Sequence, residues 1–172
     1  RSVPYRISRR HQEVSLYCEA GHGATPIRSV CSPCLAPECV RVHASSGTTG
    51  QATVVGYTKD DLQVWGRIAS RAGIYMLGGG EDSVVQVSYG YGLFTGGLGA
   101  HFGAEAAGAM VVPMSTGNTK RQIQIMKDFG VTILCATPSY ALLIADTIAE
   151  MGMSMDEFKL TGVILGAEPC SE

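Results

Sequence analysis

The sequence lacks the features that would place it at a membrane or on nucleic acid. No apolar run approaches the roughly 20 residues of a transmembrane helix, and the basic start is not followed by the apolar stretch of a secretory signal. With 13 Lys and Arg against 15 Asp and Glu, the net charge is -2, so the basic excess of a nucleic-acid binder is also missing. The 45% hydrophobic and 16% charged residues instead predict a globular protein, and 172 residues suffice for one domain with a core.

Residues 1–39 lack lysine altogether and show no helix or strand periodicity. They contain four of the six cysteines and four of the seven prolines, together with Arg1, Arg6, Arg9, Arg10 and Arg28. This content is typical of coding sequence translated in a wrong frame, and we expect the correct frame to begin near Val40. We therefore interpret 1–39 as an atypical segment, non-native or disordered, and 40–172 as a partial α/β domain. Because the chain starts with Arg1 rather than Met and stops in a loop, we expect both ends to be truncated.

The cysteines lack the paired spacing of a regular zinc site. One C-x-x-C pair exists, Cys31 and Cys34, and no second pair follows at a regular distance. Zinc remains an alternative because further potential ligands lie nearby, namely Cys18, Cys39, His11, His22 and His43. We assign no metal ligand, and we expect reduced thiols because the body of the chain resembles a cytosolic enzyme.

From Val40 onward, apolar strand patterns alternate with helical ones. Strands are predicted over 52–57, 83–88, 109–113, 131–136 and 162–165, and helices over 59–77, 96–108, 119–129, 138–151 and 154–158. Thr58 is a candidate N-cap of the first helix, and Gly78 to Gly80 end it. This alternation predicts an α/β fold with a parallel sheet and helices on both faces.

A loop rich in hydroxyl groups and glycine stands at residues 45–50, with the sequence Ser-Ser-Gly-Thr-Thr-Gly. Such a loop can bend around an anion and direct N–H and O–H donors at it, and triphosphate is the obvious ligand. The lysine of the common phosphate loop is missing, since Gln51 follows Gly50. The missing lysine argues against an ordinary P-loop NTPase.

A second glycine-rich segment, residues 89–97, follows a predicted strand and opens a helix. Its glycines Gly90, Gly92 and Gly96 are a loose relative of the dinucleotide-binding fingerprint. However, the next strand ends in Pro113, Met114 and Ser115 without the carboxylate that would hold a ribose. The aromatic residues of the segment either line an apolar ligand pocket or pack into the core.

The order and spacing of these motifs from Val40 to Glu172 resemble the phenylacetate–CoA ligases of the adenylate-forming superfamily. The resemblance covers about three-quarters of the chain. It rests on Arg41 to Gly50, Thr53 to Thr58, Tyr89 to Gly99, His101, Gly103 to Glu105, Gly117 to Thr119, Thr137 to Tyr140 and Gly166 to Pro169.

The resemblance implies a cytoplasmic ligase that activates an aryl acid with ATP and Mg²⁺ and transfers it to coenzyme A. In such a ligase the β- and γ-phosphates of ATP would be held by Ser45, Ser46, Gly47, Thr48, Thr49 and Gly50. Glu168 and Pro169 would lie against the adenine, and Tyr89, Phe94 and Ala167 would line the acid pocket. The full-length enzyme would be a homodimer that binds small molecules only. A related cofactor-adenylating synthetase and a non-catalytic nucleotide binder or inactive product remain the alternatives.

The sequence departs from the family pattern in several places. Gln51-Ala52 replaces a Lys-Pro pair that is common after the loop, and Cys170 stands where an aromatic residue is common. The family's later metal-binding Glu, ribose-binding Asp and catalytic Lys have no counterpart within the 172 residues. We therefore expect these residues alone not to complete thioester formation.

Overall fold

The computed structural model describes residues 39–45 and 54–170. These belong to two compact units, Arg1–Leu62 and Gln63–Glu172. The Cys31 and Cys34 pair, the residues Ser46 to Gly50 of the hydroxyl-glycine loop, and Gln51 lie outside the described residues.

The first unit contains an antiparallel hairpin of β1 (Arg41–Ala44) and β2 (Val54–Tyr57). Its register runs from Arg41 opposite Tyr57 to Ala44 opposite Val54. His43 is 1% exposed, and its ring meets the ring of Tyr57 edge-on at a centroid distance of 5.5 Å. The sequence analysis did not predict β1, because its four residues were interpreted only as the start of the loop motif.

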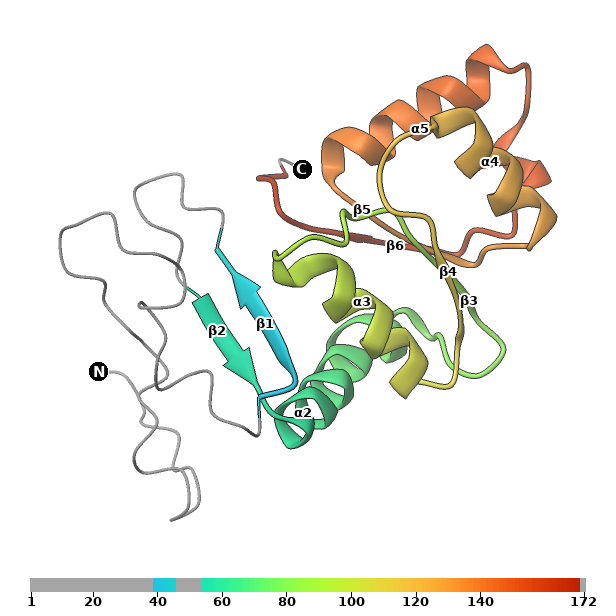
Figure 1. Cartoon of the computed structure of the whole chain (residues 1–172). Coiled ribbons are helices and arrows are strands. Elements are labelled where there is room, and N and C mark those ends of the chain that lie inside the picture. Colours follow the sequence, from blue (N-terminus) through green and yellow to red (C-terminus); the bar gives the residue numbers. More distant parts are fainter. Residues whose placement is uncertain (1–38, 46–53, 171–172) are drawn as a thin grey trace, which may run out of the picture. The chain divides into compact units, whose positions relative to one another are not determined.

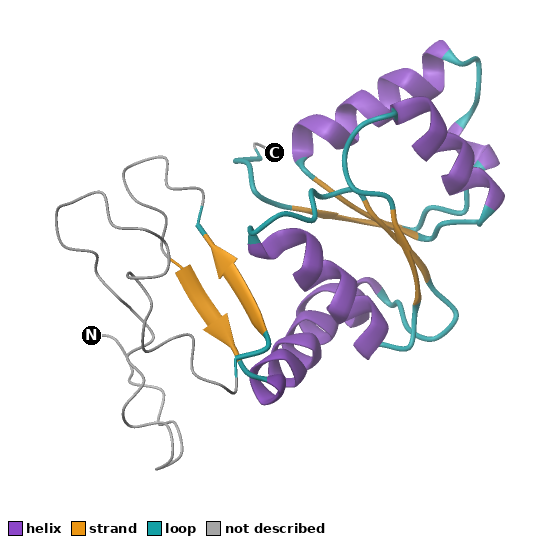
Figure 2. Ribbon diagram, viewed as in Figure 1, coloured by secondary structure: helices purple, strands orange, loops and turns teal. Residues whose placement is uncertain are grey.

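The second unit contains the predicted parallel sheet. Its strand order is β4-β3-β5-β6, with every neighbouring pair parallel. The strands are β3 (Val84–Val87), β4 (Met110–Pro113), β5 (Ile133–Ala136) and β6 (Gly162–Leu165). The crossover helices are α3 (Thr95–Ala106), α4 (Thr119–Asp128) and α5 (Pro138–Glu150), and a short 3-10 turn, η4 (Met155–Glu157), precedes β6. Figures 1 and 2 show α3 on one face of the sheet and α4 with α5 on the other, so the predicted fold class is confirmed.

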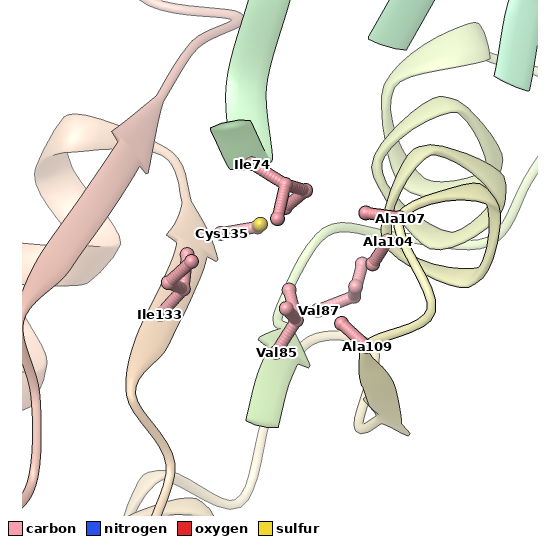
Figure 3. Packing of buried hydrophobic residues seen from close by; sticks show 8 residues of the cluster. All are labelled: Ile74, Val85, Val87, Ala104, Ala107, Ala109, Ile133 and Cys135. Carbon is pink, nitrogen blue, oxygen red and sulfur yellow. The ribbon is translucent and has the colours of Figure 1, made fainter. Parts of the chain in front are cut away.

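Each face of the sheet has its own hydrophobic core. On the α3 face, eight residues pack together, as Figure 3 shows: Ile74, Val85, Val87, Ala104, Ala107, Ala109, Ile133 and Cys135. On the other face, α4 and α5 cover β5 through Ile123, Met126, Val131, Leu134, Ala136, Ile144 and Ile148. Burial of successive strand residues on opposite faces explains why these strands read as continuous apolar runs.

The predicted helix over 59–77 forms in three pieces. An α-helix, α2 (Lys59–Ala69), is followed by a π-helical turn, η2 (Ser70–Ile74), and a 3-10 turn, η3 (Tyr75–Leu77). The Thr58 hydroxyl and the Asp61 carboxylate cap the start, since the Thr58 N–H donates to Asp61 at 2.9 Å and the Asp61 N–H donates to Thr58 at 3.2 Å. The end at Gly78 was predicted, and its φ of 72° is the left-handed conformation that glycine adopts readily.

The change from α to π helix coincides with two contacts around Ser70, one within the helix and one with α3. The Ser70 hydroxyl donates to the Arg67 carbonyl at 2.9 Å, which competes with the regular helix ladder. At the same place α3 packs closely against the end of α2: a Cβ built on Gly103 would lie only 2.8 Å from the Cβ of Ala69. The sequence period alone could not predict either contact.

The strand order creates a topological switch point between β3 and β5. From β3 the chain crosses to β4 on one side, and the next crossover returns past β3 to β5 on the other side. Ligands of open α/β sheets bind outside the carboxyl ends of the strands at such a point. The segments that begin at Ser88 and Thr137 leave the sheet there. Among the described residues, no helix is both long and apolar enough to cross a membrane.

Candidate functional site

The loops that follow β3 and β6 adjoin at the carboxyl edge of the sheet. The Tyr89 hydroxyl, just after β3, donates to the carbonyl of Ile164 in β6 at 3.0 Å. A Cβ on Gly166 would lie 3.4 Å from the same hydroxyl oxygen. The structure therefore brings together two segments that the sequence analysis had linked only by resemblance, the one at Tyr89 and the one at Gly166 to Pro169.

The aromatic loop, residues 89–94, divides between core and surface. Tyr89 and Tyr91 pack against the core on the α3 face, and burial is the main cause that raises the pKa of each phenol to about 12. Phe94 is 49% exposed and Leu93 is 57% exposed. The core-packing alternative from the sequence thus applies to the two tyrosines, whereas Phe94 is open to solvent.

Glu168 links the loop after β6 to the start of α5. Its carboxylate accepts the Ser139 N–H at 3.0 Å and the Ser139 hydroxyl at 2.9 Å. These hydrogen bonds lower the pKa of the Glu168 carboxyl, and a negative charge is stabilised at a helix N-terminus. Ala167, next to it, has a φ of 69°, which is unusual for a residue with a side chain. The loop after β6 is therefore held in a specific conformation over the end of β5.

A buried amide network supports the loop after β4. Gln86, Ser88 and Gln122 are each at most 1% exposed, and the Ser88 hydroxyl donates to the Gln122 side-chain oxygen at 2.6 Å. The Gln122 amide nitrogen then donates to the carbonyls of Ser115 at 3.0 Å and Gly117 at 2.8 Å. The sequence analysis missed this network. Gln86 was the available signal, as a polar residue within an otherwise apolar strand.

The hydroxyl-glycine loop is described only at its first residue. Ser45 directly follows β1, and Val54, the first residue of β2, pairs with Ala44. The hairpin thus holds Ala44 and Val54, which flank the segment 45–53, next to each other. The five other predicted phosphate-binding residues lie outside the described part of the chain.

Two further features limit the chemistry of the described residues. The structure has Met114 and Ser115 after β4, so no carboxylate stands where a dinucleotide-binding fold would hold a ribose. Within residues 39–45 and 54–170, no group of three or more His, Cys, Asp or Glu is placed to hold a metal ion.

Sequence comparison finds curated relatives of one kind. The chain is 52% identical over 135 residues to a phenylacetate–coenzyme A ligase of Pseudomonas putida. It is 49% identical over 135 residues to one of Thermus thermophilus and 47% identical over 136 residues to one of Escherichia coli. Each match covers 78% of this chain and 30–31% of the relative, so the chain spans about a third of the length of these relatives. No protein-family model matches the sequence.

Structure comparison gives the same class of enzyme. A 2-hydroxyisobutyryl-CoA ligase in an open conformation, in complex with 2-HIB-AMP and CoA, matches with a TM-score of 0.70 at 26% identity. The match covers 77% of this chain and 30% of that structure. The same ligase in the thioesterification state matches with a TM-score of 0.69 at 28% identity. Over the stretch that these comparisons cover, the chain is similar to phenylacetate–CoA ligases and has the fold of a CoA ligase.

Proposed function

We propose that residues 40–170 supply the ATP- and acid-binding part of an AMP-forming ligase that converts phenylacetate, or a related aryl acid, to its CoA thioester. The observation that supports this most strongly is the 47–52% identity to phenylacetate–CoA ligases, because it extends over 78% of this chain. The reaction would have two steps. The carboxylate first attacks the α-phosphorus of ATP and releases pyrophosphate, and the CoA thiol then attacks the acyl carbon and releases AMP.

In the first step, the hydroxyl-glycine loop would hold the β- and γ-phosphates. The attack brings a carboxylate against a polyanion, so N–H and O–H donors around the phosphates stabilise the charge that gathers in the transition state. Mg²⁺ would arrive with the triphosphate, since this ion is commonly bound through substrate phosphates. Because Gln51 stands where a lysine is common, the phosphate charge would be stabilised by the polar donors and by Mg²⁺.

The acid would bind beside the aromatic loop, between the strand ends where the switch point lies. Tyr89 and Ala167 belong to adjoining loops, and Phe94, later in the loop that begins at Tyr89, has an exposed ring. The Tyr89 hydroxyl is engaged by the Ile164 carbonyl, so its ring rather than its hydroxyl would face an aryl group.

The adenine would lie against the turn at Glu168 and Pro169. Both oxygens of the Glu168 carboxylate accept hydrogen bonds from Ser139. We therefore assign Glu168 the task of fixing this turn, so that its backbone and Pro169 form the surface for the base.

The second step requires groups that the described residues do not supply. The catalytic lysine and the CoA-binding surface would come from the remaining two-thirds of the length of the relatives. Homodimerisation belongs to the same proposal for the whole enzyme. The use of ATP and CoA as substrates supports a cytoplasmic location and a role in phenylacetate catabolism.

The test is a chimera in which residues 40–170 replace the matching segment of the Pseudomonas putida relative. We expect the purified chimera to form phenylacetyl-CoA from phenylacetate, ATP and CoA, with AMP released in equal amount. The parent enzyme is the control for expression and assay. A folded chimera that forms no thioester with any aryl acid would refute the proposal.

A panel of acids distinguishes activation of an aryl acid from activation of a hydroxy acid. The structural match to 2-hydroxyisobutyryl-CoA ligases makes 2-hydroxyisobutyrate the informative second substrate. Preference for phenylacetate supports the aryl-acid assignment, whereas preference for the hydroxy acid would overturn it while leaving acyl adenylation in place.

A further inference from the structure

Three polar side chains, one before α3 and two within it, lie within hydrogen-bond distance of one another in sequence order and are not used by the reaction proposed above. The Tyr91 hydroxyl lies 3.1 Å from His101 Nδ1, and His101 Nε2 lies 3.1 Å from Glu105 Oε1. The Tyr91 and His101 rings meet edge-on at 5.8 Å. The sequence analysis assigned no role to His101, although its spacing of four from Glu105 places both on one side of a helix.

The chemistry of the three groups fixes the direction of the hydrogen bonds. An ionised Glu105 can only accept, so His101 must donate from Nε2. In a neutral imidazole Nδ1 is then the acceptor, and Tyr91 donates to it. Burial, Cys135 and Glu105 raise the pKa of Tyr91 to about 12, so its phenol keeps the proton that it donates.

Tyr91 is well placed to fix the aromatic loop. Its neighbours Gly90 and Gly92 have no side chains, and a Cβ built on either would meet nothing within 4 Å. A Cβ on Gly97 would lie 2.7 Å from the Gly90 carbonyl oxygen, so the loop lies close against the first turn of α3. Tyr89 attaches the start of the loop to β6, and Tyr91 attaches its middle to α3.

We propose that Tyr91, His101 and Glu105 form one directed hydrogen-bond chain that holds the aromatic loop, which makes His101 and Glu105 positioning residues for the acid-binding site. The assignment of the acid to this loop rests on the proposed function above, whereas the hydrogen-bond chain itself does not. The hydrogen-bond chain acts through Tyr91. It fixes the position of the aromatic loop, including Phe94, relative to Tyr89.

The first experiment measures the hydrogen-bond chain directly in the 172-residue protein. Histidine side chains labelled with ¹⁵N are observed by NMR at pH 8, and His101→Gln identifies the His101 signals among those of the four histidines. We expect the Nε2–H tautomer, a change at Nδ1 in Tyr91→Phe, and a change at Nε2 in Glu105→Ala. Asp146→Asn, on the exposed side of α5, is the matched control and should change neither signal. An Nδ1–H tautomer, or signals indifferent to both variants, would overturn the proposal.

The second experiment measures positioning in the chimera. His101→Leu removes both polar atoms at similar size, whereas His101→Gln keeps one acceptor and one donor. We expect His101→Leu to raise KM for phenylacetate by about 2-fold to 10-fold, the range of one or two lost hydrogen bonds. KM for ATP should stay within about 2-fold, and His101→Gln should recover part of the loss.

The two experiments distinguish the two proposals. If the unmodified chimera is inactive, the proposed function fails, and the NMR signals alone decide whether the hydrogen-bond chain exists. If the chimera is active but His101→Leu changes KM for ATP and for phenylacetate alike, or lowers kcat alone, His101 does not position the acid site.

Discussion

At the scale of single residues, the hydrogen bonds of Glu168 join it to a partner that is distant in the sequence. By resemblance it belongs to the turn beside the adenine, and a lone glutamate in a loop usually faces solvent. In the structure Glu168 is exposed, and both of its carboxylate oxygens also accept hydrogen bonds from Ser139 at the start of α5. The partner is 29 residues away in the sequence, so no local pattern could predict the contact.

We predict that Glu168→Gln lowers the melting temperature at pH 7 by a small amount, because the amide loses the charge and one acceptor oxygen. Hydrogen bonds from Ser139 lower the pKa of Glu168 in the folded state. Its contribution is therefore present above the unfolded pKa of about 4.3 and disappears as the pH falls through the folded pKa. The difference between variant and parent should vanish at strongly acidic pH in thermal scans.

Glu150→Gln is the matched control at the opposite end of α5. A negative charge in the last turn is not stabilised by the helix dipole, so this variant should be neutral or slightly more stable at pH 7. Equal losses in both variants would contradict the role given to Glu168.

A second prediction concerns Cys135, a buried thiol on β5 with 0% exposure. Burial raises its pKa from 9.0 to about 12. A raised folded pKa gives stability that is complete below pH 9 and is lost as the pH rises toward 12, at about 1.4 kcal/mol per pH unit. Tyr89 and Tyr91 add to this loss from pH 10 upward, since their pKa values are also raised to about 12.

Urea unfolding at pH 8 and pH 9.5 checks this prediction. We expect Cys135→Ala to lower the free energy of unfolding at pH 8 but to flatten its decline between the two pH values. An unchanged slope would show that the thiol does not titrate with unfolding.

At the scale of elements, α3 lies against the end of α2 through small residues. A Cβ on Gly103 would stand 2.8 Å from the Ala69 Cβ and 3.0 Å from the Ala69 carbonyl carbon, which is backbone and cannot rotate away. We predict that Gly103→Ala destabilises the protein by about 1–3 kcal/mol through overpacking. The change is measured as the midpoint shift in urea unfolding.

Gly96→Ala in the same helix is the control. Its new methyl group would lie 3.4 Å from a ring atom of Phe94, which is an ordinary contact with a movable side chain. The better helix propensity of alanine should leave stability unchanged or raise it by up to about 1 kcal/mol. Similar losses in both variants would contradict the close packing of α3 on α2.

The buried network around Gln122 gives a further prediction for the loop between β4 and α4. Gln122→Leu keeps the volume but removes the Gln122 donor from the carbonyls of Ser115 and Gly117, of which Gly117 keeps only the Tyr140 hydroxyl at 3.3 Å, and this loss should cost about 1–3 kcal/mol. Gln124→Leu, on the exposed side of α4, should change stability by less than about 0.5 kcal/mol. Both are measured by chemical unfolding, and a cost shared by both variants would argue against the network.

The elements that the sequence predicted well are those with a strong local signal. The strand over 162–165 and the helix that opens at Pro138 have the predicted starts, because β-branched runs and a proline at the first turn act locally. The strand Arg41–Ala44 and the π turn at Ser70 were missed, because both depend on a partner: β2 for the strand, and α3 for the turn. Tyr89 and Glu168 lie in loops that follow strands, as the sequence predicted, but the sequence could not reveal the hydrogen bonds of their side chains.

At the scale of the whole molecule, the sheet order supports the functional assignment. The loops after β3, β5 and β6 leave the sheet at one edge, and the switch point between β3 and β5 lies among them. The predicted hydroxyl-glycine loop belongs to the other unit, in which Ala44 pairs with Val54. The chain thus contains the segments that we propose for ATP and acid, and it spans about a third of the length of the matched relatives.

We predict that the 172-residue chain alone is stabilised by ATP but not by NAD, and forms no acyl-CoA. Thermal-shift measurements with each nucleotide check the first part, and a thioester assay checks the second. Stabilisation by NAD alone would favour a dinucleotide-binding protein and contradict the ligase assignment.

The central claim is that residues 40–170 supply the part of the enzyme that forms the acyl adenylate. Phenylacetate-dependent exchange of labelled pyrophosphate into ATP tests it most directly, because exchange requires only the first step of the reaction. In the chimera with the Pseudomonas putida relative, we predict exchange that depends on phenylacetate and does not require CoA. A chimera that folds and binds ATP but shows no exchange with phenylacetate or any related aryl acid would contradict the claim.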